Sequence, residues 1–148
     1  MQRACASTLG TESSGITLEK IYRCEHSPMR TQLFWVELID CSTFVSVHFV
    51  RHKIGVEHFV QSKRYDRATY TEVPNRFTPV KHSMLINAEA LITMSRKRLC
   101  RQASAETIAV MQAIKDAVAA VDPDLAVHMQ PNCVYRNGCP ELKPCGFF

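Results

Sequence analysis

The sequence predicts an α+β fold, with an antiparallel or mixed sheet packed against helices in a single domain of residues 1–148. The chain has 148 residues and 46% hydrophobic side chains, which suits one compact core and is too short for two ordinary domains. Its first half contains short stretches rich in aromatic and β-branched residues, and its second half contains longer stretches with a helical repeat. Strands followed by helices are typical of α+β proteins.

Two strands are expected near the beginning of the chain, after a polar lead-in over residues 1–14. In residues 15–26, GITLEKIYRCEH, apolar and polar side chains alternate, which favours a half-buried strand. Residues 31–40, TQLFWVELID, are dense in aromatic and branched side chains and predict a second strand. Pro28 lies between them, where its fixed backbone and missing N–H favour a turn. The two strands are therefore expected to pair.

Residues 43–53 are expected to form a helix, with Ser42 as its N-cap and Gly55 just after its end. The β-branched content of this stretch also fits a strand, but the capping residues favour the helix. Residues 66–82 contain two prolines and little periodicity, so they predict a loop.

Three helices are expected in the second half of the chain. Residues 83–102 have a strong helical repeat. Residues 105–121 follow Ser104, a good N-cap, and place their apolar side chains on one face. A short helix over residues 123–129 begins at an Asp-Pro pair. Residues 130–148 then form a tail that contains three cysteines.

Composition argues against several classes of protein. The net charge is +4, and no long Lys/Arg run or basic stripe interleaved with aromatic residues is present, so nucleic acid is not the favoured partner. No apolar run is long enough to span a bilayer, and no apolar segment follows the first Arg as in a secretory signal. We therefore expect a cytoplasmic protein whose seven cysteines are reduced thiols.

The stretch VRHKIGVEHFVQSKRYDR, residues 50–67, places many cations beside apolar side chains. In a helix, His48, Arg51 and His52 share one face while the other faces are apolar, so Arg51 is expected to be buried. A buried guanidinium needs an anion, because removing an unpaired charge from water is costly. One candidate anion is a phosphate of a bound nucleotide, which fits the planar fork of arginine. The commoner anion is a carboxylate of the chain itself, here Glu37, Asp40 or Glu57.

Asn87 and Arg98 give an independent indication of a ligand. They lie eleven residues apart, so in a helix they share a face and are about 16 Å apart along its axis. Leu91 and Met94 lie between them on that face, which places a polar group at each end of an apolar surface. Such a surface suits a long ligand such as a dinucleotide.

Three motifs together resemble the flavin-dependent thymidylate synthases. RHK at 51–53, followed by SKRY at 62–65, resembles the family motif RHR-x7/8-S, which usually continues as S-x-R-Y. NAEALITMSRKRLCRQASAET, residues 87–107, resembles a later helix that reads N-A-R-x-L, with a ligand-binding Arg eleven residues after the Asn. HSPMR, residues 26–30, resembles the H-x-S/T-P element. The resemblance covers residues 26–107 and is nearest to a short, phage-associated branch.

The resemblance implies a reaction, its cofactors and its binding residues. The reaction is reductive methylation of dUMP to dTMP, in which methylene-tetrahydrofolate supplies the carbon, reduced FAD supplies hydride and NADPH reduces the flavin. Members of the family are homotetramers. The residues implied to bind FAD are His26, Arg51, His52, Lys53, Glu57 and Asn87. The residues implied to bind dUMP are His48, Gln61, Ser62, Lys63, Arg64 and Arg98. The implied catalytic residues are Ser62, Arg64 and Arg98.

Ser62 is expected to orient dUMP rather than to act as a nucleophile. No base is identifiable beside it in the sequence, and an unactivated serine hydroxyl is a weak nucleophile. The resemblance also suggests why so many cations gather in this stretch, because two phosphorylated ligands would be their counterions.

The chain departs from the family pattern at several positions. Lys53 replaces the second Arg of R-H-R, which keeps the charge but loses the bidentate fork, and Glu89 stands where N-A-R has its Arg. Residues 66–79 are shorter than the corresponding family segment and lack one dUMP-binding Arg, for which Arg67 or Arg76 is the candidate substitute. These departures leave three alternatives open: a changed pyrimidine substrate, a hydroxymethylating reaction, or a nucleotide- or nucleic-acid-binding protein without flavin chemistry.

The tail supports a separate hypothesis. His128, Cys133, Cys139 and Cys145 are close enough in sequence to form a zinc site of three thiolates and one imidazole, which would make the chain a zinc-stapled interaction module. Their spacing is not the compact C-x2-C kind, so free thiols and no metal are the favoured interpretation. Cys100, outside the tail, is expected to be a packing residue.

Overall fold

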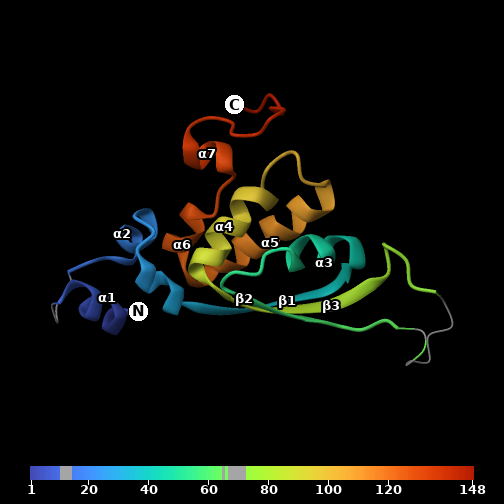
Figure 1. Ribbon diagram of the computed structural model, residues 1–148, viewed down its shortest axis with the longest axis horizontal. Coiled ribbons are helices and arrows are strands. Elements are labelled where there is room, and N and C mark those ends of the chain that lie inside the picture. The colour runs from blue at the N-terminus through green and yellow to red at the C-terminus, as the bar shows by residue number, and fades with distance from the viewer. Residues whose placement is uncertain (11–14, 65, 67–72) are drawn as a thin grey trace. The chain divides into compact units, whose positions relative to one another are not determined.

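The computed structural model describes residues 1–10, 15–64, 66 and 73–148, and Figure 1 shows its helices and strands. The described residues form two compact units: the helical unit, Met1–Leu33 with Asn87–Phe148, and the sheet unit, Phe34–Ile86. Helices together with a three-stranded sheet confirm the α+β class. The elements are α1 Gln2–Leu9, α2 Leu18–Arg23, the 3-10 helix η1 Ser27–Thr31, β1 Leu33–Ser42, α3 Thr43–Val50, β2 Val56–Val60, β3 Pro79–Asn87, α4 Ala88–Arg98, α5 Ala105–Val121, α6 Pro123–His128 and α7 Asn132–Arg136.

The sheet has the strand order β1-β3-β2, with β3 in the centre. β2 and β3 are antiparallel, and their register pairs Val56 with Ile86 and Val60 with His82. Side chains alternate between the two faces of a strand, so His58 lies on the same face as these paired residues. On β3 this face is fully buried at His82 and Ile86. The sheet unit therefore buries a histidine within its apolar layer.

The helix α3 begins at Ser42, whose hydroxyl accepts a hydrogen bond from the Val45 N–H, as predicted. It ends at Val50, with Arg51 as its C-cap, and is therefore shorter than the predicted helix over 43–53. Gly55 then takes a left-handed backbone conformation with a φ of 73°, which lets the chain turn into β2. Because Arg51 lies beyond the helix it is exposed, and the prediction that it is buried is wrong.

The predicted strand over residues 15–26 is also wrong, because this stretch contains the helix α2. Thr17 caps the helix by accepting a hydrogen bond from the Lys20 N–H, and Ile21 and Tyr22 form its buried face. In a short stretch, apolar residues can be spaced both two apart, as in a strand, and three or four apart, as in a helix, so the pattern does not separate the two structures. The expected pairing of this stretch with the following strand is therefore wrong as well.

The central strand β3 was expected as part of a loop and part of a helix. The predicted loop over 66–82 and the predicted helix over 83–102 meet inside it, so both boundaries are wrong. The strand is apolar on its buried face and continues directly into α4 with no intervening loop. The change from the two-residue repeat of a strand to the 3.6-residue repeat of a helix is therefore hard to detect in the sequence. The predicted strand over 31–40 is confirmed as β1, displaced by two residues.

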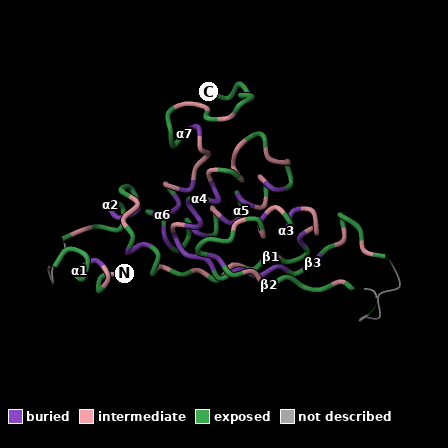
Figure 2. Tube along the Cα trace, in the orientation of Figure 1, coloured by how far each residue is buried: buried purple, intermediate pink, exposed green. Residues whose placement is uncertain are grey.

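The helical unit contains the predicted helices of the second half. Asn87 caps α4 by accepting a hydrogen bond from the Ala90 N–H at 2.9 Å. α5 starts after Ser104 and α6 starts at Pro123, as predicted. Much of α4 is buried, as its colour in Figure 2 shows. No helix in the described ranges combines the length and the apolar character needed to cross a bilayer.

Two short helices lie in the predicted polar lead-in and in the tail, for which no helix was predicted. Within the predicted polar lead-in, residues 2–9 form α1, and its Cys5 is buried. Residues 11–14 of that lead-in lie outside the described residues. The tail contains α7, which ends at Asn137 with a positive φ of 51°.

A buried hydrogen bond joins α2 to the start of α6. The Tyr22 hydroxyl donates to Asp122 Oδ2 at 2.6 Å, and Asp122 Oδ1 accepts from the Leu125 N–H at 3.0 Å. Burial, and then the Asp122 carboxylate, raise the pKa of Tyr22 above its ordinary value. The hydroxyl therefore stays protonated and remains a donor, while one carboxylate serves both as a helix cap and as a tertiary contact.

Tyr22→Phe should lower the free energy of unfolding by about 1.5–3 kcal/mol, because it removes a hydrogen bond to a buried charged group. Urea denaturation followed by circular dichroism measures this loss. Tyr135→Phe is the matched control, because Tyr135 is 46% exposed, and it should change stability by less than about 0.5 kcal/mol. Equal losses in the two variants would contradict the role given to the Tyr22–Asp122 contact.

Candidate functional site

The basic turn, residues Arg51, His52 and Lys53, connects α3 to β2 in the sheet unit. Arg51 and Lys53 are exposed, and no carboxylate of the described residues forms an ion pair with either. Of the acids expected to neutralise Arg51, Glu37 instead pairs with Lys81, Nζ to Oε1 at 3.4 Å. The expectation of an internal carboxylate partner for Arg51 is therefore wrong for the described chain, because the side chain reaches solvent.

The backbone of the basic turn is held at both polar groups of His52. Its N–H donates to the Phe49 carbonyl at 2.9 Å, and its carbonyl contacts His58 Nε2 at 2.7 Å. Two flexible cationic side chains thus extend from a backbone that is fixed on each side.

A histidine chain, Ser46–His82–His58, supplies that second contact. Ser46 Oγ lies 3.1 Å from His82 Nδ1, and His82 Nε2 lies 2.9 Å from His58 Nδ1. The His52 carbonyl can only accept, so His58 Nε2 carries a proton and donates. With both imidazoles neutral, His58 Nδ1 then accepts from His82 Nε2–H, and His82 Nδ1 accepts from the Ser46 hydroxyl. All donors of the chain therefore point in one direction, from α3 through the sheet to the basic turn.

The electrostatics of the histidine chain favour a neutral His82. Burial, and then the charge of His58, lower the pKa of His82 from 6.5 to about 4. His82 has no exposed surface and Ser46 is 3% exposed. At neutral pH the core therefore contains an uncharged His82 that satisfies both of its ring nitrogens. Through His58, this buried imidazole also supports the carbonyl of the basic turn.

Two of the predicted dUMP-binding residues after β2 contact other residues of the sheet unit. Gln61 extends the ladder, since its N–H donates to the Lys81 carbonyl at 2.8 Å and its Oε1 accepts from the Lys81 N–H at 3.2 Å. Ser62 is exposed and Lys63 is half-buried. Arg64 forms an exposed bidentate ion pair with Asp66, with Nε to Oδ1 at 2.9 Å. Gln61 and Arg64 thus both have intramolecular partners.

Several other candidates in this unit have clear positions. The His48 ring contacts the Phe44 ring, with centroids 4.4 Å apart, and Glu57 is an exposed residue of β2. Arg76 lies over the Phe44 ring at 4.2 Å, so its cation is stacked on an aromatic face. Arg67, the other candidate for the missing dUMP-binding Arg, lies outside the described residues, as does Tyr65 of the SKRY motif.

The remaining candidates lie in the helical unit, at the two ends of α4. Asn87 is its N-cap, and Arg98 is its last residue and half-buried. Arg30 donates two hydrogen bonds to the Glu89 carboxylate, one from Nε at 2.8 Å and one from a terminal nitrogen at 3.0 Å. Arg30 belongs to the HSPMR motif, so a guanidinium lies beside the position where the family pattern has its Arg. In the same motif, His26 Nε2 is buried without a hydrogen-bond partner among the described residues.

The predicted site residues therefore belong to both units. Of the twelve residues implied to bind FAD or dUMP, His26, Asn87 and Arg98 lie in the helical unit and the other nine lie in the sheet unit, while the four zinc candidates lie in the helical unit. Sequence reasoning missed Ser46 and His82 as residues that position the basic turn. The signal was weak, because the alternation in 56–60 was not recognised as a strand, and β3 was placed in a loop and a helix.

Comparisons of the chain with protein-family models, with curated proteins and with solved structures gave no match.

The pH dependence of stability should report the buried His82. Its pKa of about 4 in the folded protein is below its ordinary value of 6.5, so the unfolded chain takes up this proton first as the pH falls. Neutral His82 therefore makes its full contribution to the free energy of unfolding above about pH 6.5. As the pH falls toward 4 this contribution is lost, and the free energy of unfolding decreases by up to about 3 kcal/mol. Urea unfolding between pH 7.5 and 4.5 measures it.

His82→Gln should flatten this dependence between pH 7 and 5, whereas Ser83→Ala, on the next residue of β3, should leave it intact. A wild-type stability that does not change between pH 7 and 5 would show that His82 is not buried in the neutral form.

Proposed function

We propose that the chain is an FAD-dependent enzyme that methylates dUMP, or a closely related pyrimidine nucleotide, with methylene-tetrahydrofolate as carbon donor and NADPH as reductant. The observation that carries the proposal is the basic turn, whose two exposed cations have no carboxylate partner among the described residues and extend from a fixed backbone. Cations held in this way suit phosphate oxygens, because the ligand supplies the anion that the described chain does not. The three sequence motifs support the choice of FAD and dUMP.

In this proposal, the residues of the chain bind and orient the ligands. In the sheet unit, Arg51, His52 and Lys53 hold the phosphates of FAD, with Glu57 as a further contact; the resemblance assigns His26 and Asn87 of the helical unit to the same ligand. A reduced flavin, when bound, supplies the hydride. In the sheet unit, His48, Gln61, Ser62, Lys63 and Arg64 bind dUMP, with Ser62 orienting the nucleotide; the resemblance assigns Arg98 of the helical unit to dUMP as well, and the two arginines to its phosphate or pyrimidine. A homotetramer is the assembly that the resemblance proposes.

The Arg30–Glu89 ion pair bears on one departure from the family motif. Glu89 replaces an arginine there, and a carboxylate alone would repel a phosphate. The bidentate contact with Arg30 neutralises that carboxylate and keeps a guanidinium at the beginning of α4. This supports a binding role for the HSPMR motif in spite of the substitution.

A second candidate function is nucleotide binding without flavin chemistry. The observations that favour it are Lys53 and Glu89, which replace arginines of the family motifs and weaken the implied flavin contacts. The Arg64 and Asp66 side chains, which pair with each other, are about half exposed, so a ligand phosphate can compete for Arg64 at modest cost. Binding of dUMP without retention of FAD would favour this second function.

The direct test is reconstitution of the purified chain with FAD, followed by addition of dUMP. The first function predicts a yellow protein whose flavin spectrum changes with dUMP, and methyl transfer to dUMP with methylene-tetrahydrofolate and NADPH. Assays with dCMP in parallel identify a changed pyrimidine substrate. Protein that retains no FAD under these conditions would overturn the proposal.

Arg51→Gln should weaken FAD binding about 10- to 100-fold, because it removes a charge-assisted hydrogen bond worth about 1.5–3 kcal/mol. Fluorescence titration with FAD measures the dissociation constant. Lys53→Arg should bind at least as tightly as wild type, because it restores the bidentate fork. Arg23→Gln, which changes an exposed arginine of α2, is the control and should bind FAD normally. Wild-type affinity in Arg51→Gln would contradict the role of the basic turn.

A further inference from the structure

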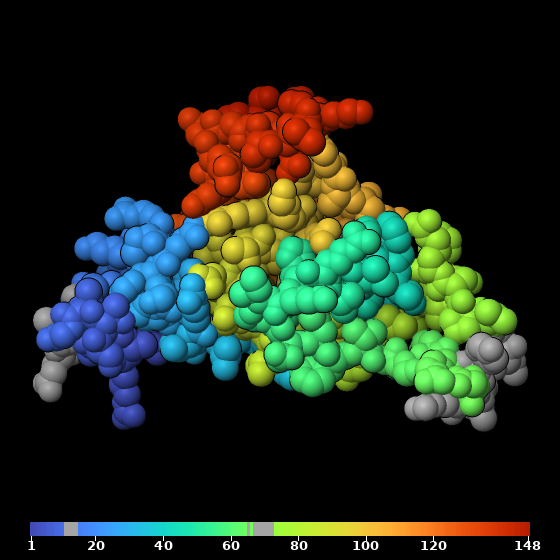
Figure 3. All heavy atoms as spheres, in the orientation of Figure 1, coloured from blue at the N-terminus to red at the C-terminus, as the bar shows by residue number. Residues whose placement is uncertain are grey.

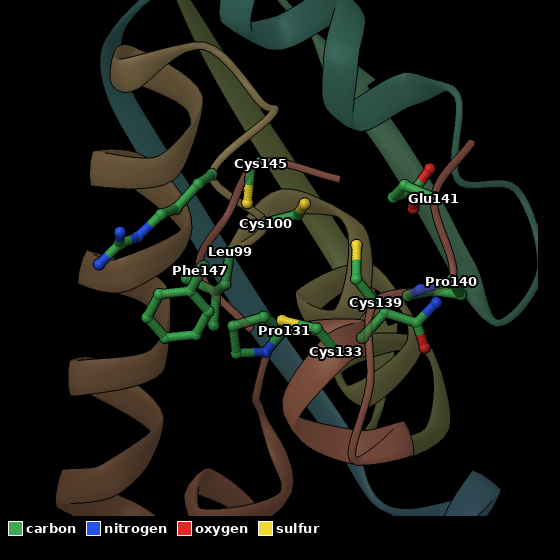
Figure 4. A pocket seen from close by; sticks show the side chains of 11 residues that line it. Leu99, Cys100, Pro131, Cys133, Cys139, Pro140, Glu141, Cys145 and Phe147 are labelled. Atoms are coloured by element: carbon green, nitrogen blue, oxygen red, sulfur yellow. The ribbon is translucent and has the colours of Figure 1, made fainter. Parts of the chain in front are cut away.

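Four of the seven cysteines line one cavity in the helical unit. The cavity has a volume of about 70 Å³, and its lining includes Cys100, Cys133, Cys139 and Cys145. Cys100 follows α4, Cys133 lies in α7, and the other two lie in the tail. Figure 4 shows their four sulfur atoms pointing toward a common space. Segments more than thirty residues apart in sequence are thus brought together at their thiols.

The three later cysteines are evenly spaced, the first in α7 and the other two in the irregular segment after it. Cys133, Cys139 and Cys145 are six residues apart, and glycine or proline lies next to the last two on both sides. Gly146 has a φ of 73°, and the Gly138 N–H donates to the Cys133 carbonyl at 2.9 Å. A segment with such flanking residues bends easily, so it can direct successive thiols to one point.

The tail has few apolar anchors of its own. Leu142 is fully exposed, and Phe147 and Phe148 are 42% and 57% exposed. Ordering each residue costs about 1–2 kcal/mol of backbone entropy, so a tail of this composition needs another source of stability. In the space-filling view its atoms form one block beside α4 and the turn after it (Figure 3). A metal held by several thiolates is a known way to stabilise such a segment.

The charged side chains that line the cavity are Arg101 and Glu141. Glu141 is paired with Lys97, Nζ to Oε1 at 2.9 Å, and the Arg101 guanidinium lies 4.1 Å from the centre of the Phe147 ring. A divalent cation with four thiolates has a net double negative charge. Arg101 is therefore the cation placed to offset it.

We propose that Cys100, Cys133, Cys139 and Cys145 bind one Zn²⁺ ion that fastens the tail to the turn after α4. The four thiols lose their protons to solvent on binding, and the sulfurs become tetrahedral ligands. In the described chain no three potential ligands are already arranged for a metal ion, so the sulfurs must converge into the cavity between them. His128 does not line this cavity, and Cys100 takes the place that the sequence hypothesis assigned to it. This inference is independent of the proposed FAD and dUMP sites.

The test uses the full-length chain, purified under reducing conditions, with Zn²⁺ and Co²⁺ as probes. Metal analysis should find about one Zn²⁺ per chain. Co²⁺ should give the visible spectrum of a tetrahedral thiolate site, and Zn²⁺ should abolish it. Cys100→Ser and Cys139→Ser should each lower the affinity for the metal at least about 100-fold. Cys24→Ser, which changes an exposed cysteine of the same unit, and His128→Gln should both retain wild-type affinity.

A second measurement separates metal binding from general unfolding. Trypsin cleavage after Arg136, which Asn137 follows, should become faster in Cys145→Ser and in chelated wild type, while circular dichroism retains the signal of α4 and α5. The proposal is overturned if the reduced wild-type chain binds no Zn²⁺, if Cys100→Ser retains full affinity, or if His128→Gln loses the metal. Disulfide bonds among these four cysteines in protein purified without a chelator would also overturn the proposal.

Discussion

A neutral imidazole buried in a protein core needs one hydrogen-bond donor and one acceptor as partners for its two ring nitrogens. The arrangement of the sheet unit depends on the partners of His82. Its acceptor nitrogen faces Ser46 on α3 and its donor nitrogen faces His58 on β2, so one side chain connects a helix, the central strand and an edge strand. The direction of donation ends at the His52 carbonyl. A protonated His82 would donate from both ring nitrogens, so its bond to Ser46 would have to reverse, and its charge would have to be buried. The hydrogen-bond chain that leads to the basic turn therefore runs through a buried group that stays neutral at neutral pH.

Local chemistry explains which elements could be predicted from the sequence. Ser42, Ser104 and Pro123 each mark a helix start within a few residues, and all three helices begin as expected. The failures occur where the residues fit two periods. The pattern of Leu18–Arg23 fits a strand, and only the cap at Thr17 identifies a helix. Residues 79–87 are recognisable as a strand mainly through their pairing with β2. Pairing partners lie far along the chain, so no local pattern reveals them.

The same distinction explains the candidate sites. Arg51 belongs to a motif and was found, but its burial was wrongly expected because the end of α3 was placed too late. His82 has no motif and gains its meaning only from partners 24 and 36 residues away. Cys100 was expected to be a packing residue because nothing near it in sequence suggests a metal ligand. The fold brings it to the cavity lined by the tail cysteines, whereas His128, nearer to them in sequence, is not among the lining residues.

The central claim is that a basic turn, held in place by the histidine chain, receives the phosphates of a nucleotide. Nitrogen-edited NMR during titration with FAD tests it most directly, because it observes the imidazoles and the backbone amides together. The account predicts that His82 is neutral with a protonated Nε2, and that the amides of Arg51, His52 and Lys53 shift in a saturable way. A charged His82 at neutral pH, or FAD binding that leaves these three amides unchanged, would contradict it.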